Sequence, residues 1–320
     1  MAKRRQQQIS AAIDVGSNSV HLLVAQLGAA QTLARRGLTI VDDRSQLLGL
    51  GEVVDREARI PFEQRGQLLT RIAEYLLVAR KMGAKQLTLI GTDPFRRAAN
   101  GADVALDVGA VTGIALHVIS VRTEALLTFV GVTGGVAPAE PLVVVDVGGG
   151  STEVSIYTTD APIALLPVAI GSARLTRGIV AHDPPTAAEL DKLHAAAQAS
   201  ARELPEMRWP ASAAPRAIFV GGTATNLARL GRLSRAALKE DRRTLAKMTS
   251  AQVVEHFSVR PQRARQLAAG AAIVDAVLER LGLDGATTAE TSLRDGAIIA
   301  AARFGDMWPD RLTELLGPNG

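Results

Sequence analysis

Two periodicities of hydrophobic and polar positions divide the chain into predicted strands and helices. An apolar, β-branched run at 142–147 is followed by three glycines, two hydroxyl residues and an alternating run at 154–158. This order predicts a strand, a tight turn and a second strand. Short apolar runs at 86–90, 117–120 and 217–220 predict further strands.

The same layout occurs near the start of the chain. The apolar run at 11–13 ends in Asp14, as the later run reaches Asp146, and a turn containing glycine follows each acid. Strands are predicted after the first turn at 20–26 and 32–41, and a matching third strand at 163–170 in the second copy. A repeat on this scale predicts a duplicated domain rather than a solenoid.

Apolar residues at helical spacing occur in both copies. Helices are predicted at about 61–83, 104–111, 123–132, 186–204, 225–230, 262–281 and 292–304. Pro94 predicts a helix start that places Arg96 and Arg97 in the first turn, where the helix dipole disfavours cations. This local conflict indicates either a functional pair or two solvated arginines.

The Gly- and Pro-rich stretch at 134–141 indicates the boundary between the two copies. We expect an N-terminal domain at 1–128 and a C-terminal domain at 129–300. The tail at about 301–320 has enough apolar residues for a short helix, which we expect to pack on the N-terminal domain.

The turn after each acid has the chemistry of an anion site. Glycine lets the backbone approach a ligand, and successive N–H groups turned inward form a nest for phosphate. Asp146 and Glu153 flank the second turn, as groups holding a cation against phosphate would. The alternative is an ordinary glycine-rich hairpin. A Gly-Gly-Thr turn that ends at Thr223 and leads into a helix is a third such element.

Two further groups have both a structural and a functional interpretation. Glu124 lies near the start of the predicted helix at 123–132, where an acid also stabilises the helix itself. The stretch at 235–247 is either a solvated face or a guide for a polyanion. Its basic residues are Arg235, Lys239, Arg242, Arg243 and Lys247.

Composition restricts the class of protein. The 320 residues are 47% hydrophobic and 21% charged, which is typical of a globular enzyme with room for two domains. The absence of cysteine excludes disulfides and thiolate metal sites. A net charge of +4 suits a polyanionic substrate, although mild basicity is common. Aromatic residues are only 3%, which disfavours nucleic-acid polymers as partners. No apolar run approaches the roughly 18 residues of a membrane span, so we expect a cytoplasmic protein.

The motifs together resemble those of the Ppx/GppA family, which comprises exopolyphosphatases and guanosine pentaphosphate phosphohydrolases. The stretches 13–19 and 145–153 resemble its two phosphate loops, and 221–228 resembles its third loop. The segment from Thr92 to Asn100 resembles its T-x-x-x-R-x-A-x-N motif, with Arg96 at the arginine. Residues 119–125 resemble the segment of its catalytic glutamate, which falls on Glu124, and 292–296 resemble its late L-R-E-G element.

The chain departs from the family pattern in three places. The paired acids and the arginine usual around the catalytic glutamate are replaced, so Glu124 is the acid that remains there. Asp93-Pro94 deviates from the common A-T-x-A. The sequence ends before the additional C-terminal helical domain, of HD type, that longer members carry.

The resemblance implies an α/β fold of two actin-like, ribonuclease H-like domains with mixed sheets around an interdomain cleft. It implies Mg²⁺-dependent hydrolysis of the terminal phosphoanhydride of polyphosphate, with guanosine pentaphosphate as the alternative substrate and a homodimer as a possible assembly. A kinase of the same superfold and a nucleotide-gated actin-like protein are less favoured alternatives.

The resemblance also assigns roles to individual residues. Glu124 would activate water, with Glu153 as a second catalytic acid, and Asp146 and Glu153 would hold Mg²⁺. The turns would supply N–H groups and hydroxyls to phosphate. The implied phosphate contacts are Asp14, Gly16, Ser17, Asn18, Ser19, Arg96, Gly148, Gly149, Gly150, Ser151, Thr152, Gly222 and Thr223.

Overall fold

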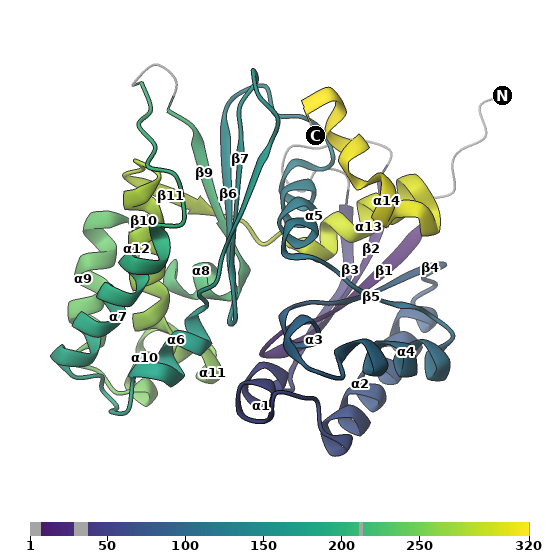
Figure 1. Cartoon of the computed structure of the whole chain (residues 1–320), viewed down its shortest axis with the longest axis horizontal. Helices are drawn as coiled ribbons and strands as arrows, with labels where there is room; N and C mark the ends of the chain where they lie inside the picture. The colour runs from purple at the N-terminus through teal and green to yellow at the C-terminus, as the bar shows by residue number, and fades with distance from the viewer. Residues whose placement is uncertain (1–7, 29–37, 211–213, 320) are drawn as a thin grey trace. The chain divides into compact units, whose positions relative to one another are not determined.

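The computed structural model describes residues 8–28, 38–210 and 214–319, which form two compact units. Unit 1 comprises Met1–Ala137 and Thr291–Gly320, and unit 2 comprises Pro138–Glu290. Figure 1 traces unit 1 in purple and blue with the yellow C-terminal helices, and unit 2 in teal and green. Part of the strand predicted at 32–41 falls at 29–37, outside the described residues.

Unit 1 is built on a five-stranded sheet with the order β3-β2-β1-β4-β5. The central strand β1 pairs antiparallel with β2 and parallel with β4. β1 is buried on both faces, which explains why its sequence is nearly continuous in apolar residues. The strands are β1 Ile9–Val15, β2 Ser19–Leu27, β3 Leu38–Leu47, β4 Gln86–Gly91 and β5 Leu116–Val118.

Unit 2 repeats this arrangement in a six-stranded sheet with the order β10-β11-β9-β6-β7-β8. Its central strand β6 again pairs antiparallel with the next strand, β7, and parallel with β9. The predicted duplication is therefore present in the strand topology. The strands are β6 Leu142–Val147, β7 Thr152–Tyr157, β8 Ala164–Val168, β9 Arg216–Val220, β10 Leu233–Ser234 and β11 Gly285–Thr288.

Helices cover both faces of the unit 1 sheet. Figure 1 shows α1 to α4 on one face and α5, α13 and α14 on the other. Apolar residues of α2 at helical spacing, including Leu68, Ile72 and Leu76, are buried in this core. The helices are α1 Leu50–Glu57, α2 Phe62–Lys81, α3 Asp93–Arg97, α4 Gly101–Thr112, α5 Val121–Thr133, α13 Leu293–Phe304, η2 Gly305–Met307, α14 Trp308–Arg311 and η3 Leu312–Asn319.

In unit 2 the helices α6, α7, α9 and α12 lie on one side of the sheet (Figure 1). α12 is alanine-rich and buried along most of its length, which lets α7 and α9 pack closely against it. The helix predicted at 262–281 is two helices, because the chain turns between α11 and α12. The helices are α6 Ser172–Ile179, α7 Ala187–Ala201, α8 Gly221–Leu227, α9 Arg235–Leu245, α10 Ser250–Phe257, α11 Pro261–Ala264 and α12 Leu267–Arg280.

The units differ from the predicted domains in where the chain passes from one to the other. The predicted boundary at residue 128 falls inside α5, which continues without a break to Thr133. Residues 291–300, predicted for the second domain, belong to unit 1 because α13 packs directly on α5. A Cβ atom at Gly131 or Gly296 would overlap the backbone of the opposite helix, so these glycines set the close approach.

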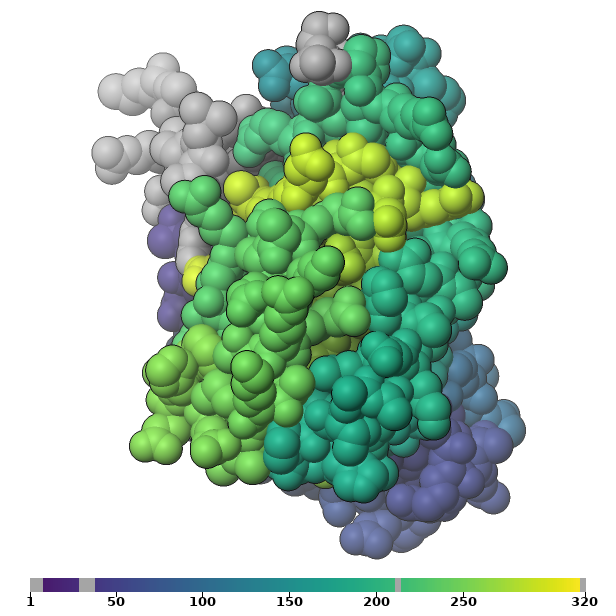
Figure 2. Space-filling model, turned by 90° about the vertical axis from the view of Figure 1, so that its left-hand side faces the viewer, coloured from purple at the N-terminus to yellow at the C-terminus, as the bar shows by residue number. Residues whose placement is uncertain are grey.

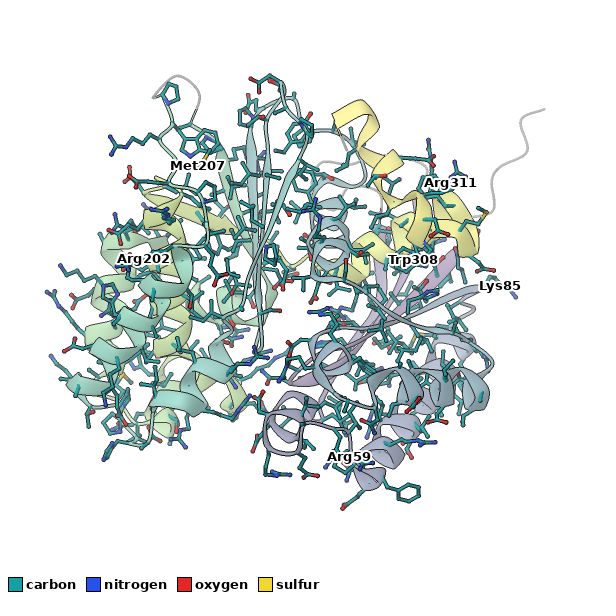
Figure 3. The ribbon with its side chains drawn as sticks, viewed as in Figure 1. Arg59, Lys85, Arg202, Met207, Trp308 and Arg311 are labelled. Atoms are coloured by element: carbon teal, nitrogen blue, oxygen red, sulfur yellow. The ribbon has the colours of Figure 1, made fainter. Side chains whose placement is uncertain are left out.

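The C-terminal helices contribute to the core of unit 1. Trp308, labelled in Figure 3, is 2% exposed and meets the ring of His117 edge-on, with 5.4 Å between the ring centroids. Burial lowers the pKa of His117 from its usual value, and the negative charge of Asp306 opposes that shift. Among the described residues, no helix is both long and apolar enough to cross a membrane.

Candidate active site

The two predicted phosphate turns close with the same hydrogen bond. The N–H of Gly16 donates to the carbonyl of Ser19 at 3.1 Å, and the N–H of Gly148 donates to that of Ser151 at 3.0 Å. These two N–H groups therefore hold the turns together, contrary to the expectation that they donate to a ligand. The N–H groups of Ser17, Gly149 and Gly150 make no hydrogen bond with another described residue. They are the donors that each turn offers.

A helix start is docked on each turn in the same way. The N–H of Gly51, in α1, donates to the carbonyl of Ser17 at 2.8 Å, and the N–H of Arg174, in α6, donates to that of Gly149 at 3.0 Å. A Cβ atom at Gly51 would lie 2.7 Å from the Cβ of Ser17, and one at Gly171 would overlap the backbone of the second turn. Glycine at these positions lets the helix support the loop directly.

The first turn is anchored by a charged network within unit 1. The hydroxyl of Ser17 donates to Asp93 Oδ2 at 2.8 Å, and Arg97 Nε donates to both oxygens of Asp93 at 3.0 Å. Arg97 also contacts Asp55 at 2.5 Å. The pKa of Arg97 is raised, since its bonds to Asp93 and Asp55 outweigh the opposing effect of burial. Because the single proton of the Ser17 hydroxyl is directed to Asp93, that hydroxyl offers a ligand its lone pairs, and not the donor we expected.

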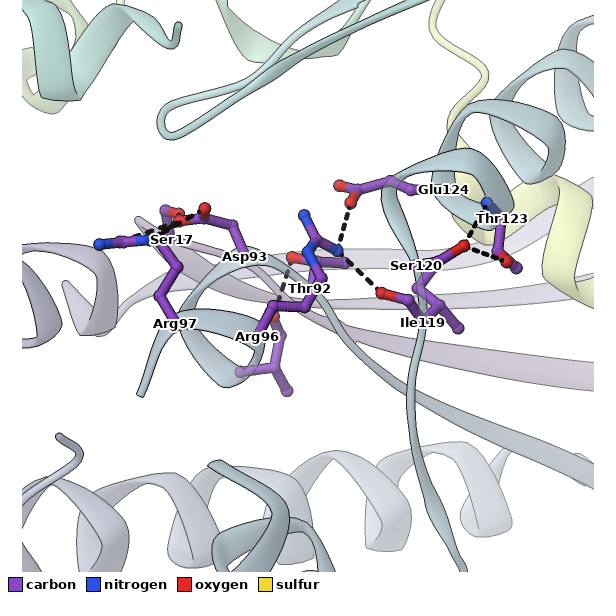
Figure 4. Close-up of polar contacts among 10 residues, drawn as sticks. Ser17, Thr92, Asp93, Arg96, Arg97, Ile119, Ser120, Thr123 and Glu124 are labelled. Carbon is purple, nitrogen blue, oxygen red and sulfur yellow. Dashed lines mark hydrogen bonds and ion pairs between the residues drawn. The ribbon is translucent and has the colours of Figure 1, made fainter. Parts of the chain in front are cut away.

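Glu124 is paired with Arg96 (Figure 4). Arg96 NH1 donates to Glu124 Oε2 at 2.8 Å and to the carbonyl of Ile119 at 2.9 Å. The two side chains are only 10% and 19% exposed. Glu124 is thus not a solvated acid at a helix start, because a partner 28 residues away in the chain covers it. Ser120 caps α5 by accepting from the N–H of Thr123, which fixes the turn that carries Glu124.

The position of the arginines in their helix is also corrected. α3 is a single short helix, Asp93–Arg97, so Arg96 and Arg97 lie in its last turn, where cations are favourable. Arg96 reaches Glu124 and Ile119 through NH1. Among the described residues no contact of its Nε or NH2 groups is found, so these donors remain for a ligand.

The second turn has an acid on each of its strands. Asp146 of β6 and Glu153 of β7 stand directly opposite each other in the antiparallel register, so both side chains lie on one face of the sheet. Glu153 is only 3% exposed. Like charges at opposed positions repel, and a cation between them removes that cost. In unit 1 the equivalent pair is Asp14 and His21, which makes the two turns chemically unequal.

Thr152 and Thr223 have structural contacts. Thr152 is fully buried, and its hydroxyl donates to the carbonyl of Ile170 at 2.7 Å. The hydroxyls of Thr223 and Ser172 are 2.9 Å apart, and that of Ser172 also reaches the carbonyl of Gly148 at 3.3 Å. These bonds tie the second turn to the third loop. Ser19 and Asn18 are likewise engaged, since Ser19 is buried and the Asn18 carbonyl accepts from two backbone N–H groups.

The third loop lies against a partly buried arginine, Arg263, which also interacts with Asp146. α8 begins at Gly221 rather than near residue 225, and Gly221 has a φ of +84°, which favours glycine. A Cβ atom there would overlap the carboxylate of Asp146. A Cβ atom at Gly222 would lie 2.8 Å from the guanidinium of Arg263. Burial and the neighbouring Arg260 lower the pKa of Arg263, which Asp146 opposes.

Arg263 was not identified from the sequence. It lies on the four-residue helix α11, in a stretch that had been read as the start of one long amphipathic helix. No spacing rule links it to Gly222 or Asp146, which are 41 residues or more away. The proline at the start of α11 marks a helix start, but it precedes the predicted helix and so does not indicate the break between Ala264 and Leu267.

The two acids of the second turn suit a hard cation that takes few ligands from the protein. Among the described residues, no group of three or more His, Cys, Asp or Glu side chains has the arrangement of a metal cage. The opposed pair of Asp146 and Glu153 still fits Mg²⁺, because this ion keeps several waters and uses one or two carboxylates together with substrate phosphates.

Comparison with known proteins decides the family. A profile of the Ppx/GppA phosphatase family matches residues 24–303. The chain belongs to the Ppx/GppA phosphatase family. Among its relatives are exopolyphosphatase 2 of Mycobacterium tuberculosis, 32% identical over 91% of this chain and 98% of that protein, and exopolyphosphatase 1 of the same organism, 30% identical over 90% and 86%.

Solved Ppx/GppA structures confirm the predicted fold. The Aquifex aeolicus family member superposes with a TM-score of 0.78 at 23% identity, covering 94% of this chain and 99% of that one. An exopolyphosphatase-like protein gives a TM-score of 0.76 at 26% identity, with 92% and 98% covered. The two mixed sheets with their helices are the actin-like α/β architecture of this family.

Proposed function

We propose that the chain is an exopolyphosphatase, which hydrolyses the terminal phosphoanhydride of inorganic polyphosphate and releases orthophosphate. The observation that carries this proposal is the buried pair of Glu124 and Arg96 beside a phosphate-type turn, in a member of a phosphatase family. Relatives that match about nine tenths of the chain are named exopolyphosphatases, which supports polyphosphate as the substrate.

Glu124 is proposed to be the general base. Hydrolysis requires a positioned water and stabilisation of charge on the transferred group, and a positioned base contributes roughly 10²–10⁴ in rate. Arg96 fixes the direction of the carboxylate by bonding Oε2. The bond of Arg96 to the backbone of Ile119 limits its own movement. A carboxylate held in this way loses little freedom when it accepts a proton from water.

Phosphate oxygens are proposed to bind the donors that the fold leaves for them. In unit 1 these are the Nε and NH2 groups of Arg96 and the N–H of Ser17, and in unit 2 they are the N–H groups of Gly149 and Gly150. Arg96 would then contact substrate and base together. Arg263 is proposed as a further cation near the second turn, since it lies against Gly222.

Asp146 and Glu153 are proposed to hold Mg²⁺. Their opposed positions place two carboxylates on one face of the sheet, and Mg²⁺ uses one or two carboxylates together with waters and substrate phosphates. When bound, the ion would neutralise charge on the phosphate oxygens. Glu153 is the second candidate for the general base if variants of Glu124 keep their activity.

The experiment that tests this function is a phosphate-release assay on polyphosphates of defined length beside guanosine pentaphosphate, with Mg²⁺. We expect a higher kcat/KM on polyphosphate. A higher kcat/KM on guanosine pentaphosphate would make that molecule the substrate in place of polyphosphate. No phosphate release from either compound would reject the proposed hydrolase activity. A homodimer and a cytoplasmic location are further proposals, which size-exclusion with light scattering and cell fractionation would test.

A further inference from the structure

Unit 2 contains a cavity of about 630 Å³ formed by α7, α9 and α12. This volume is within the range of small-molecule sites. Figure 2 looks onto this face, with α9 in green, α7 in teal-green and α12 in yellow-green between them. None of the residues proposed above for catalysis lines it. Its described lining is Ala187, Leu190, Asp191, His194, Arg235, Ala236, Lys239, Arg242, Arg243, Ala246, Asp275 and Glu279.

One face of α9 directs basic side chains into this cavity. Arg235, Lys239, Arg242 and Arg243 recur at helical spacing, so they fall on one side of the helix. Like charges three and four positions apart on a helix repel each other and destabilise it. A helix with fewer charges on this face would be more stable. The row of cations facing the cavity therefore indicates a binding role.

The inner wall holds two of the arginines in place. Asp275 is 8% exposed, and its carboxylate contacts Arg235 at 3.3 Å and Arg242 at 4.0 Å. Glu279 pairs with Arg235 at 2.7 Å. Arg242 NH1 also lies 3.1 Å from Nδ1 of His194, and this hydrogen bond requires the ring proton on Nε2. The acids of this wall thus orient Arg235 and Arg242 and are themselves neutralised.

Two cations whose ion pairs are weak or absent line the cavity. Lys239 has no hydrogen bond or ion pair with another described residue. Arg243 pairs with Glu240 through side chains that are both about two thirds exposed, and such solvent-exposed ion pairs are weak. Asp191 opposes these cations from α7. The apolar residues of the lining, Leu190 and three alanines, offer contact to an organic group.

We propose that this cavity is a second anion site, distinct from the catalytic residues, for a small molecule carrying a phosphoanhydride group. Lys239 and Arg243 supply cations that can pair with the anion, and Arg242 supplies a guanidinium that is already held in place. The phosphoanhydride could belong to a short inorganic polyphosphate or to a nucleoside diphosphate. The apolar lining residues distinguish these sources, because only the nucleotide has an organic part that can contact them.

The test is calorimetric titration of the full chain at physiological salt with two probes, tripolyphosphate and ADP. The variants are Lys239→Glu, Arg243→Glu and the double substitution, with Lys192→Glu as the matched control. Lys192 is an exposed cation of α7 that does not line the cavity. Hydrogen exchange of residues 235–246 is followed with and without each probe, because it locates binding at α9 even when the probe also occupies the catalytic site.

We expect the double variant to weaken the site for at least one probe by about tenfold or more, since charge-assisted hydrogen bonds are lost. The control should change binding less than twofold, and the probe should protect α9 in the wild type but not in the double variant. If the double variant binds only ADP more weakly, the ligand is a nucleoside diphosphate. If it binds both probes equally more weakly, the site recognises the phosphoanhydride group itself. Unchanged affinity for both probes, with no protection of α9, would overturn the proposal. Thermal melting of each variant confirms that it is folded.

Discussion

Replacing Glu124 by Gln and by Ala separates its catalytic role from its part in the buried pair. Gln keeps a carbonyl oxygen that can accept from Arg96 NH1 but cannot act as a base. Ala removes both the acceptor and the charge, which leaves a guanidinium that is only 19% exposed without its partner. The two variants should therefore lose activity alike and differ in stability.

The expected magnitudes follow from the burial of the pair. Breaking a buried ion pair costs about 3–5 kcal/mol, and we take the lower half of that range because Arg96 keeps its bond to Ile119 and some access to water. Retaining a neutral acceptor reduces the loss to about 1 kcal/mol. In a unit of this size, 1 kcal/mol shifts the melting temperature by about 2–4 °C. The Ala variant should then melt roughly 6–16 °C lower and the Gln variant within about 4 °C of wild type.

The assay pairs differential scanning calorimetry with phosphate release from polyphosphate. Both variants should turn over at least about 10²-fold more slowly. A cycle with Arg96→Met, alone and with Glu124→Ala, measures the coupling between the side chains, which should exceed about 1 kcal/mol. Equal melting of the Gln and Ala variants would refute the structural argument, and wild-type kcat in the Gln variant would refute Glu124 as the base.

Three further results are expected. Asp146→Asn should raise the Mg²⁺ concentration for half-maximal activity, because a hard cation loses a charged oxygen; an unchanged metal titration would remove Asp146 from the site. Gly221→Ala, at a φ of +84° and against Asp146, should lower the melting temperature and activity together, and a neutral result would contradict the close approach. Burial raises the pKa of Asp241 from 3.8 to about 6, so the folded state holds the proton more tightly and stability falls as pH rises between those values. Asp241→Asn should flatten that fall, and parallel stability–pH curves for the two proteins would argue against it.

The architecture was largely predictable because the duplicated unit has a local signature. An apolar run, an acid and a glycine turn fixed the positions of β1 and β6, and the matching order of segments predicted their partners. The docking of Gly51 and Gly171 on the turns corresponds to glycine segments that stand at the same place in each copy. Regular periodicity likewise predicted α2 and α7 to within a few residues.

Long-range contacts account for what could not be predicted. The burial of Glu124 depends on Arg96, and neither side chain differs locally from a solvated one. Arg263 comes to Gly222 through a short helix that interrupts a longer periodic pattern. The first passage between units, after Ala137, falls in the Gly- and Pro-rich stretch at 134–141 that the sequence indicates. The return to unit 1 at Thr291 was missed because it depends on the α5–α13 contact, which joins segments about 165 residues apart.

The central claim is that water, activated by Glu124, removes phosphate from the end of a polyphosphate chain. Hydrolysis of a chain of defined length in ¹⁸O-labelled water tests it most directly, with phosphate and residual chain analysed together. The account predicts one ¹⁸O atom in each released orthophosphate, residual chains shortened one unit at a time, and loss of both signals in Glu124→Gln. Cleavage within the chain, or phosphate transferred to another acceptor without ¹⁸O, would contradict it.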